Sequence, residues 1–147
     1  MFTFSVKRRP QNVLADTIVL GSNVTFYRCD LTSAPAIHET AEAIRRNLGD
    51  PSILVNNAGL AKVNKLIEED DAFLEQIFRV NIISHFILIK EFLPKMLEQK
   101  KGHIVSIASV GSYMSGPPLV DYCATKAAVL ALHEGKFLRI TFSELVF

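Results

Sequence analysis

The sequence predicts an α/β protein built on a doubly wound parallel sheet, and three observations carry this prediction. Short β-branched or apolar runs alternate with longer segments of helical periodicity. The 147 residues have the size of one ordinary domain, and 49% of them are hydrophobic, which is enough for a sizeable core. Polar side chains gather where the predicted strands end, the usual ligand-binding edge of such a sheet. We therefore expect one domain over residues 1–147.

Four segments of the chain are predicted to be strands. Three read as buried strands: NVTFYRCDL from Asn23, SILVNNAG from Ser52 and HIVSIASV from His103. FTFSV, from Phe2, is a further candidate upstream, followed by a short predicted helix, NVLADTIVL, that Gly21 would end. The expected order is β-α-β-α-β-α-β-α, with the strands in one parallel sheet.

Three longer helices are predicted between and after these strands. The first runs from an N-cap at Ser33 to a stop at Gly49, with an apolar stripe formed by Ile37, Ala41, Ile44 and Leu48. The second covers residues 68–102, has acids at its start and lysines at its end, and is apolar on more than one face. Such a helix is expected between the sheet and another body, such as a partner subunit. The third follows the loop GSYMSGPP and carries Tyr122.

Composition and charge exclude several functional classes. The net charge of +1 gives no reason to expect a nucleic-acid partner or an anionic membrane surface. The apolar run VNIISHFILI is far short of the roughly 20 residues that a bilayer span needs, so no membrane span is expected. Two cysteines without metal-ligand spacing are predicted to be reduced thiols, and the four histidines share no such spacing either. In MFTFSVKRRPQN the basic residues follow the apolar ones, unlike a signal peptide, which favours an intracellular protein.

The stretch YCATK, residues 122–126, raises the first functional hypothesis. Tyr122 and Lys126 are four residues apart, so a helix places them on one face, where they can serve one small site. A cation held beside a phenol favours the phenolate, which suits proton transfer. The alternative is a chance spacing in which the lysine is exposed and the tyrosine is half buried.

Other polar residues fall at the ends of the predicted strands. Asp30 closes the first of the three buried strands, Asn56 to Gly59 close the second, and Ser109 closes the third. Asn81 lies inside the long helix among apolar residues, where a buried carboxamide needs hydrogen-bond partners.

Together these residues resemble the short-chain dehydrogenase/reductase family, classical type. The resemblance rests on NNAG at a strand end, on VN in the following helix, and on Tyr-x-x-x-Lys with Ser109 thirteen residues before Tyr122. It spans about residues 23–134 and is greatest for the branch of retinol dehydrogenases and 17β-hydroxysteroid dehydrogenases. It implies a Rossmann-like fold and a catalytic tetrad of Asn81, Ser109, Tyr122 and Lys126.

The resemblance also implies a role for each residue. Tyr122 would exchange a proton with the substrate oxygen, and Lys126 would favour the phenolate and bond the nicotinamide ribose. Ser109 would hydrogen-bond the same substrate oxygen, and Asn81 would hold a water that connects Lys126 to solvent.

The implied cofactor is a nicotinamide dinucleotide. Its predicted binding residues are Asp30, Leu31, Asn57, Ala58, Gly59, Tyr122 and Lys126. The cluster Lys7, Arg8, Arg9 reads either as a solvated basic patch or as a site for a 2′-phosphate, which gives NADP(H) a slight preference over NAD(H).

Both flanks depart from the family pattern. The glycine-rich turn TGxxxGxG that follows the family's first strand is absent from this sequence, and residues 135–147 form a divergent tail in place of the C-terminal strands. We therefore expect a Rossmann-like fold that is incomplete at both ends. The chain is predicted to act as an NAD(P)-dependent oxidoreductase, or else as a noncatalytic truncated fragment or pseudo-enzyme that serves as a dimerisation partner.

The expected substrate is a lipophilic alcohol or carbonyl, such as a retinoid, steroid or fatty derivative. The expected assembly is a homo-oligomer through the helices that contain Phe86 and Tyr122. The expected location is the cytoplasm, or the face of the endoplasmic reticulum if the parent protein carries an N-terminal anchor.

Overall fold

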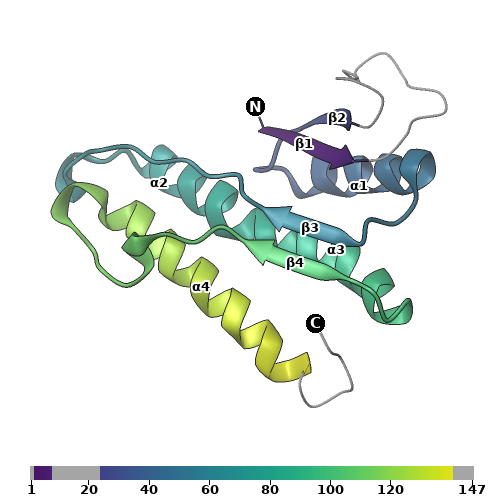
Figure 1. Ribbon diagram of the computed structural model, residues 1–147. Coiled ribbons are helices and arrows are strands. Elements are labelled where there is room, and N and C mark those ends of the chain that lie inside the picture. The colour runs from purple at the N-terminus through teal and green to yellow at the C-terminus, as the bar shows by residue number, and fades with distance from the viewer. Residues whose placement is uncertain (1, 8–23, 141–147) are drawn as a thin grey trace.

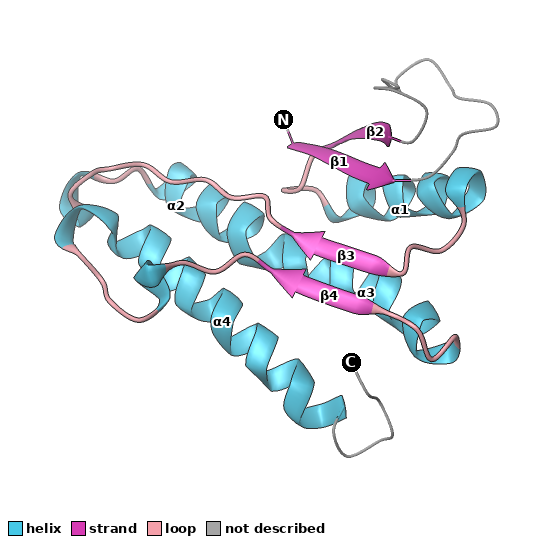
Figure 2. Ribbon diagram, viewed as in Figure 1, coloured by secondary structure: helices cyan, strands magenta, loops and turns pink. Residues whose placement is uncertain are grey.

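The structure is a computed structural model that describes residues 2–7 and 24–140, with side chains described for residues 25–135 (Figure 1). The predicted helix over residues 12–20 lies outside the described residues, as do Arg8 and Arg9. Figure 2 shows the strands and helices alternating from β2 onward. The elements are β1 Phe2–Lys7, β2 Val24–Cys29, α1 Ala34–Leu48, β3 Ile53–Asn56, α2 Asp71–Phe78, α3 Ser84–Glu98, β4 His103–Ser106 and α4 Val120–Ile140.

The central strand pair is parallel, as predicted. β3 and β4 pair in register from Ile53 opposite His103 to Asn56 opposite Ser106, and the crossover between them contains α2 and α3. Both strands therefore end at the same edge, and the segments after Asn56 and Ser106 leave the sheet side by side (Figure 1).

The prediction of one parallel sheet is wrong for β1. This strand exists, but it pairs antiparallel with β2, from Phe2 opposite Cys29 to Lys7 opposite Val24. Among the described residues the strands form two separate pairs, β1 with β2 and β3 with β4. The physical reason is that alternating hydrophobicity identifies a strand but reads the same in both directions, so it does not set the direction of pairing.

The first long helix confirms its predicted bounds and buried face. Ser33 caps α1 by accepting a hydrogen bond from the Ala36 amide at 3.3 Å. Gly49 ends the helix with a φ of 81°, a conformation that glycine adopts without steric cost. The four residues of the predicted stripe are all buried: Ile37, Ala41, Ile44 and Leu48.

The second long helix is continuous but not uniform. α2 passes through a π-helical turn, Arg79–Ile83, into α3. The side chain of Asp70 caps the start of α2, and α3 packs on α1, where Glu91 binds Arg45 at 2.8 Å and also His38. A π-helical turn often marks a functional position, and this one contains Asn81.

The hydrophobic core joins the strands to α1 and α3. It includes Cys29 and Leu31 at the end of β2, Leu54 of β3, Ile104 of β4 and Phe92 of α3. Both cysteines are free thiols and buried, as predicted. The helical run Asp71–Glu98 is long and apolar enough to cross a membrane by length and composition, but a buried core helix meets the same criteria, and 44% of its most apolar window is buried.

Candidate active site

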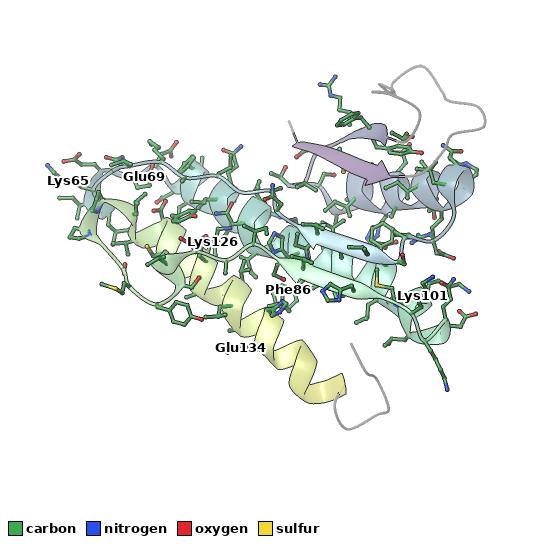
Figure 3. The ribbon with its side chains drawn as sticks, viewed as in Figure 1. Lys65, Glu69, Phe86, Lys101, Lys126 and Glu134 are labelled. Atoms are coloured by element: carbon green, nitrogen blue, oxygen red, sulfur yellow. The ribbon has the colours of Figure 1, made fainter. Side chains whose placement is uncertain are left out.

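The four predicted catalytic residues come from three parts of the fold. Asn81 lies in the π-helical turn, Ser109 follows β4, and Tyr122 and Lys126 lie in the first turns of α4. α4 contacts both the π-helical turn and the 3-10 turn Val110–Ser112, so it packs between the segments that carry Asn81 and Ser109. Figure 3 labels Lys126 on this part of α4.

Asn81 is fully buried and hydrogen-bonded on three sides. Its Oδ1 accepts from the Leu60 amide at 2.7 Å, and its Nδ2 donates to the Leu60 carbonyl at 2.9 Å. Nδ2 also donates to Thr125 Oγ1 at 3.0 Å. The partners that a buried carboxamide requires are thus protein groups: the loop after β3 and the helix α4. The water predicted beside Asn81 stays a prediction.

Lys126 is only 4% exposed, although it is a lysine. Its Nζ donates to the carbonyl of Ile107, just after β4, at 2.7 Å. Burial lowers the pKa of Lys126, because removing an ammonium from water disfavours its charged form. The same Nζ lies 5.8 Å from the centre of the Tyr122 ring, so the two side chains share one face of α4. The chance alternative of an exposed lysine does not apply.

The side chains of Asn81 and Lys126 both lie close to Gly59. A Cβ at Gly59 would lie 3.6 Å from Asn81 Oδ1 and 3.7 Å from Lys126 Nζ, while Gly59 itself is exposed. The amide oxygen of Asn81 and the ammonium of Lys126 therefore both lie on the side of Gly59 where a side chain would project. A glycine here lets another molecule approach the backbone closely.

Ser109 caps the 3-10 turn Val110–Ser112. Its Oγ accepts from the Gly111 amide at 3.1 Å, which leaves its own proton able to donate to another group. Ser112 Oγ accepts from the Ser109 amide at 3.3 Å and donates to the Lys126 carbonyl at 2.8 Å. Ser112 therefore ties the segment that carries Ser109 to α4.

The predicted cofactor residues are divided between the two strand pairs. Asp30 follows β2, and hydrogen bonds from the backbone and hydroxyl of Thr32 lower the pKa of its carboxyl. Leu31 is buried in the core, whereas Asn57 and Gly59 are exposed after β3 and Ala58 packs against the core. Gly59, Tyr122 and Lys126 are brought together, while Asp30 and Leu31 lie with the other strand pair.

Sequence reasoning missed three side chains of this site: Ser112, Thr125 and His85. His85 is 1% exposed, and neither ring nitrogen makes a hydrogen bond of normal geometry. Burial, and then the charge of Lys126, lower its pKa to about 4, against an opposing effect of the Ala58 backbone. One signal was available, because His85 follows Asn81 by four residues and a helix places both on one face.

The fold and the site together define the class of protein. The model of the family described as short chain dehydrogenase matches residues 3–136, which is most of the chain. This protein belongs to the short-chain dehydrogenase family.

The chain is similar to curated relatives that include named dehydrogenases. It is 45% identical over 113 residues to dehydrogenase RED3 of Cochliobolus heterostrophus, covering 77% of this chain and 58% of that protein. It is 41% identical over 129 residues to retinol dehydrogenase 10-B of Xenopus laevis, covering 86% and 38%. It is 37% identical over 115 residues to human estradiol 17-beta-dehydrogenase 11, covering 78% and 38%. These relatives confirm the predicted branch, and the chain spans between 38% and 58% of their length.

Solved structures agree with the Rossmann-like fold. A short-chain dehydrogenase/reductase from Burkholderia phymatum in complex with NAD superposes with a TM-score of 0.76 at 29% identity, covering 80% of this chain and 42% of that one. A metagenomic short-chain oxidoreductase in complex with NADP gives a TM-score of 0.72 at 28% identity, covering 75% and 50%. The described residues thus correspond to part of this fold.

Proposed function

We propose that this chain carries the proton-transfer centre of an NAD(P)-dependent oxidoreductase that interconverts an alcohol and a carbonyl. The observation that supports it most is the buried Lys126 ammonium, which shares a helix face with Tyr122 and lies, like Asn81, beside Gly59. A lysine is rarely buried to this degree unless a partner or a function requires it.

The chemistry follows from the placement of each group. Tyr122 gives a proton to the substrate oxygen in reduction and takes it back in oxidation. Lys126 places a positive charge 5.8 Å from the centre of the Tyr122 ring, and little water screens that charge. Ser109 donates a hydrogen bond to the same oxygen and stabilises the negative charge that develops there.

The residues beside Gly59 fit a nicotinamide cofactor. Gly59 offers exposed backbone without a side chain, and Lys126 has donors beyond the one that Ile107 accepts. Lys126 and Tyr122 would hold the nicotinamide ribose, Asn57 to Gly59 would pass beside the cofactor, and Asp30 and Leu31 would contact the adenine. When bound, the nicotinamide supplies or accepts the hydride. Solved neighbours hold NADP or NAD, and the cluster at residues 7–9 supports a slight preference for NADP(H).

The surface near this site supports a lipophilic substrate. The loop after β3 and the loop after β4 meet where the Asn64 amide donates to the Pro118 carbonyl at 3.0 Å. Both loops expose large apolar side chains: Val63, Leu66 and Ile67 from the first, and Val110, Tyr113 and Met114 from the second. Relatives named for retinol and estradiol agree with a substrate of this kind.

Oligomerisation and location belong to the same proposal. Phe86 and Ile83 of the long helix are 50% and 43% exposed, and burial of these side chains against a second copy would remove apolar surface from water. The protein would act inside the cell, in the cytoplasm. If the full-length protein carries an N-terminal anchor, it would act at the face of the endoplasmic reticulum instead.

A second candidate function is a noncatalytic dimerisation partner, such as a truncated fragment or pseudo-enzyme. It concerns these 147 residues taken by themselves, which include no glycine-rich turn of the TGxxxGxG type to bind the cofactor pyrophosphate. Losing several charge-assisted hydrogen bonds, each worth about 1.5–3 kcal/mol, weakens binding by several orders of magnitude.

Calorimetric titration with NADPH and NADH separates the two candidates. The titrations use the 147-residue chain and a chimera that adds to it the segments of RED3 that lie outside the matched region. We expect micromolar binding by the chimera and none by the chain alone. Micromolar binding by the chain alone would reject the noncatalytic candidate, and a chimera that folds but binds neither cofactor would reject the oxidoreductase.

A further inference from the structure

Thr125 links the two catalytic helices through a single hydroxyl. The side chain is fully buried, and its Oγ1 donates to the carbonyl of Tyr122 at 2.7 Å. The same Oγ1 accepts from Asn81 Nδ2 at 3.0 Å. One atom therefore contacts the backbone of the predicted acid/base and the side chain of the buried asparagine.

The direction of these two bonds is fixed. A hydroxyl has one proton, and the short bond to the Tyr122 carbonyl uses it, so Thr125 can only accept from Asn81. Asn81 is itself fixed, because the Leu60 amide and carbonyl pair with its Oδ1 and Nδ2. The loop after β3 is thereby joined through Asn81 and Thr125 to the turn of α4 that carries Tyr122 and Lys126.

The hydrogen bond between Asn81 and Thr125 affects the position of Lys126. Lys126 follows Thr125 directly, and its Nζ contacts the Ile107 carbonyl and lies 3.7 Å from where a Cβ on Gly59 would be. A small shift of α4 along the π-helical turn would move the ammonium away from both groups. Apolar contacts are not directional and do not prevent such a shift by themselves. The bond from Ser112 to the Lys126 carbonyl holds α4 to the segment after β4, whereas Thr125 holds it to Asn81 in the π-helical turn.

We propose that Thr125 is a positioning residue, whose hydroxyl sets the register of the Tyr122–Lys126 turn against Asn81 and the Gly59 backbone. This inference rests on the proposed function only for the roles of Tyr122 and Lys126. Its geometric content, the bonds of the Thr125 hydroxyl to the Tyr122 carbonyl and to Asn81, stands on the hydrogen bonds of this chain.

Ser84 provides a matched control. It is as deeply buried as Thr125, and its Oγ donates to a carbonyl of its own helix, that of Val80, at 2.6 Å. Ser84→Ala removes a comparable buried hydroxyl from the π-helical region without removing a bond between helices. Thr125→Val keeps the shape of the side chain and removes its hydrogen bond with Asn81, whereas Thr125→Ser keeps the hydroxyl.

The test uses nuclear magnetic resonance on the 147-residue chain, with two readouts. The first is hydrogen exchange of the Asn81 side-chain amide, which should be slow in the parent and at least about tenfold faster in Thr125→Val, because one donor loses its acceptor. The second is the titration of Lys126, followed at Cε. Its midpoint should rise toward the ordinary lysine value in Thr125→Val, as the ammonium regains water.

Ser84→Ala and Thr125→Ser should leave both readouts at the parent values. Equal effects of Thr125→Val and Ser84→Ala would overturn the proposal, as would fast exchange of the Asn81 amide in the parent, which needs no variant to fold. A parent in which Lys126 titrates at the ordinary lysine value would instead count against the proposed function, while the Asn81 readout would still decide the role of Thr125.

Discussion

Replacing Asn81 by alanine is expected to destabilise the protein more than its small size suggests. The side chain is fully buried and makes three hydrogen bonds. Asn81→Ala would orphan the amide and the carbonyl of Leu60, while Thr125 would keep its bond to the Tyr122 carbonyl. The main cost therefore falls on the two backbone groups of Leu60.

The magnitude follows from these two groups. An orphaned buried donor or acceptor costs about 1–3 kcal/mol, so two would cost about 2–6 kcal/mol. Leu60 is half buried and some water can reach it, so we expect the lower part of that range, about 2–4 kcal/mol. A typical domain is stable by about 5–15 kcal/mol, so this is a large fraction of the total.

Urea denaturation followed by circular dichroism measures the effect. With a slope of about 2 kcal/mol per molar urea, a loss of about 3 kcal/mol lowers the midpoint by about 1.5 M. Asn47→Ala is the control, because Asn47 is exposed and its bond to the Tyr27 hydroxyl is long, at 3.3 Å; it should change stability by less than about 0.5 kcal/mol. An Asn81→Ala variant within about 1 kcal/mol of the parent, at an unchanged slope, would refute the reasoning.

Three further predictions concern pH, packing and assembly. The pKa of His85 is about 4 in the folded protein and 6.5 as a free side chain, so the unfolded chain binds the proton more tightly. The free energy of unfolding should therefore fall by about 3 kcal/mol as the pH drops from 6.5 through 4. In urea denaturation, His85→Leu should abolish this loss of stability at low pH, and His103→Ala, at an exposed histidine, should leave it unchanged. A Cβ at Gly111 would lie 2.9 Å from Cys123 Sγ, so Gly111→Ala should lower the free energy of unfolding by about 1–3 kcal/mol. Adding Cys123→Ala should restore part of this stability, and no restoration would show that the contact is not the cause. Phe86→Glu should convert an oligomer to monomers in sedimentation velocity while Val63→Glu does not, and a parent that is already a stable monomer at micromolar concentration would contradict the proposed interface.

The sequence predicted the fold where the local signals were strong. The cap at Ser33, the stop at Gly49 and the stripe from Ile37 to Leu48 placed α1 correctly, because each signal is local and has one physical meaning. The parallel pairing of β3 with β4 followed from the long helical crossover between them. The antiparallel pairing of β1 with β2 could not be read from FTFSV, since the alternation of side chains is the same for both directions.

The shared helix face of Tyr122 and Lys126 was predictable from the sequence, but the hydrogen bonds that connect the candidate site were not. The spacing of Tyr122 and Lys126 is a local property of one helix, so it could be read directly. The bonds of Asn81 to Leu60 and Thr125 join residues that are 21 and 44 positions apart, and no local pattern encodes them. The π-helical turn was missed because RVNII, residues 79–83, carries no local signal that separates a π-helical turn from an α-helical one.

The measurement that tests the central claim most directly is deuterium transfer from C4-deuterated NADPH or NADH to a lipophilic ketone. The protein is the chimera extended by the RED3 segments, and the variants are Tyr122→Phe and Tyr27→Phe, the second a phenol on β2 that is bonded to Asn47 rather than to the site. We predict that the parent and Tyr27→Phe place deuterium on the carbinol carbon, and that Tyr122→Phe slows the transfer by about 10² to 10⁴-fold while remaining folded. Transfer by Tyr122→Phe within a few-fold of the parent would contradict the assignment of Tyr122 as the acid/base.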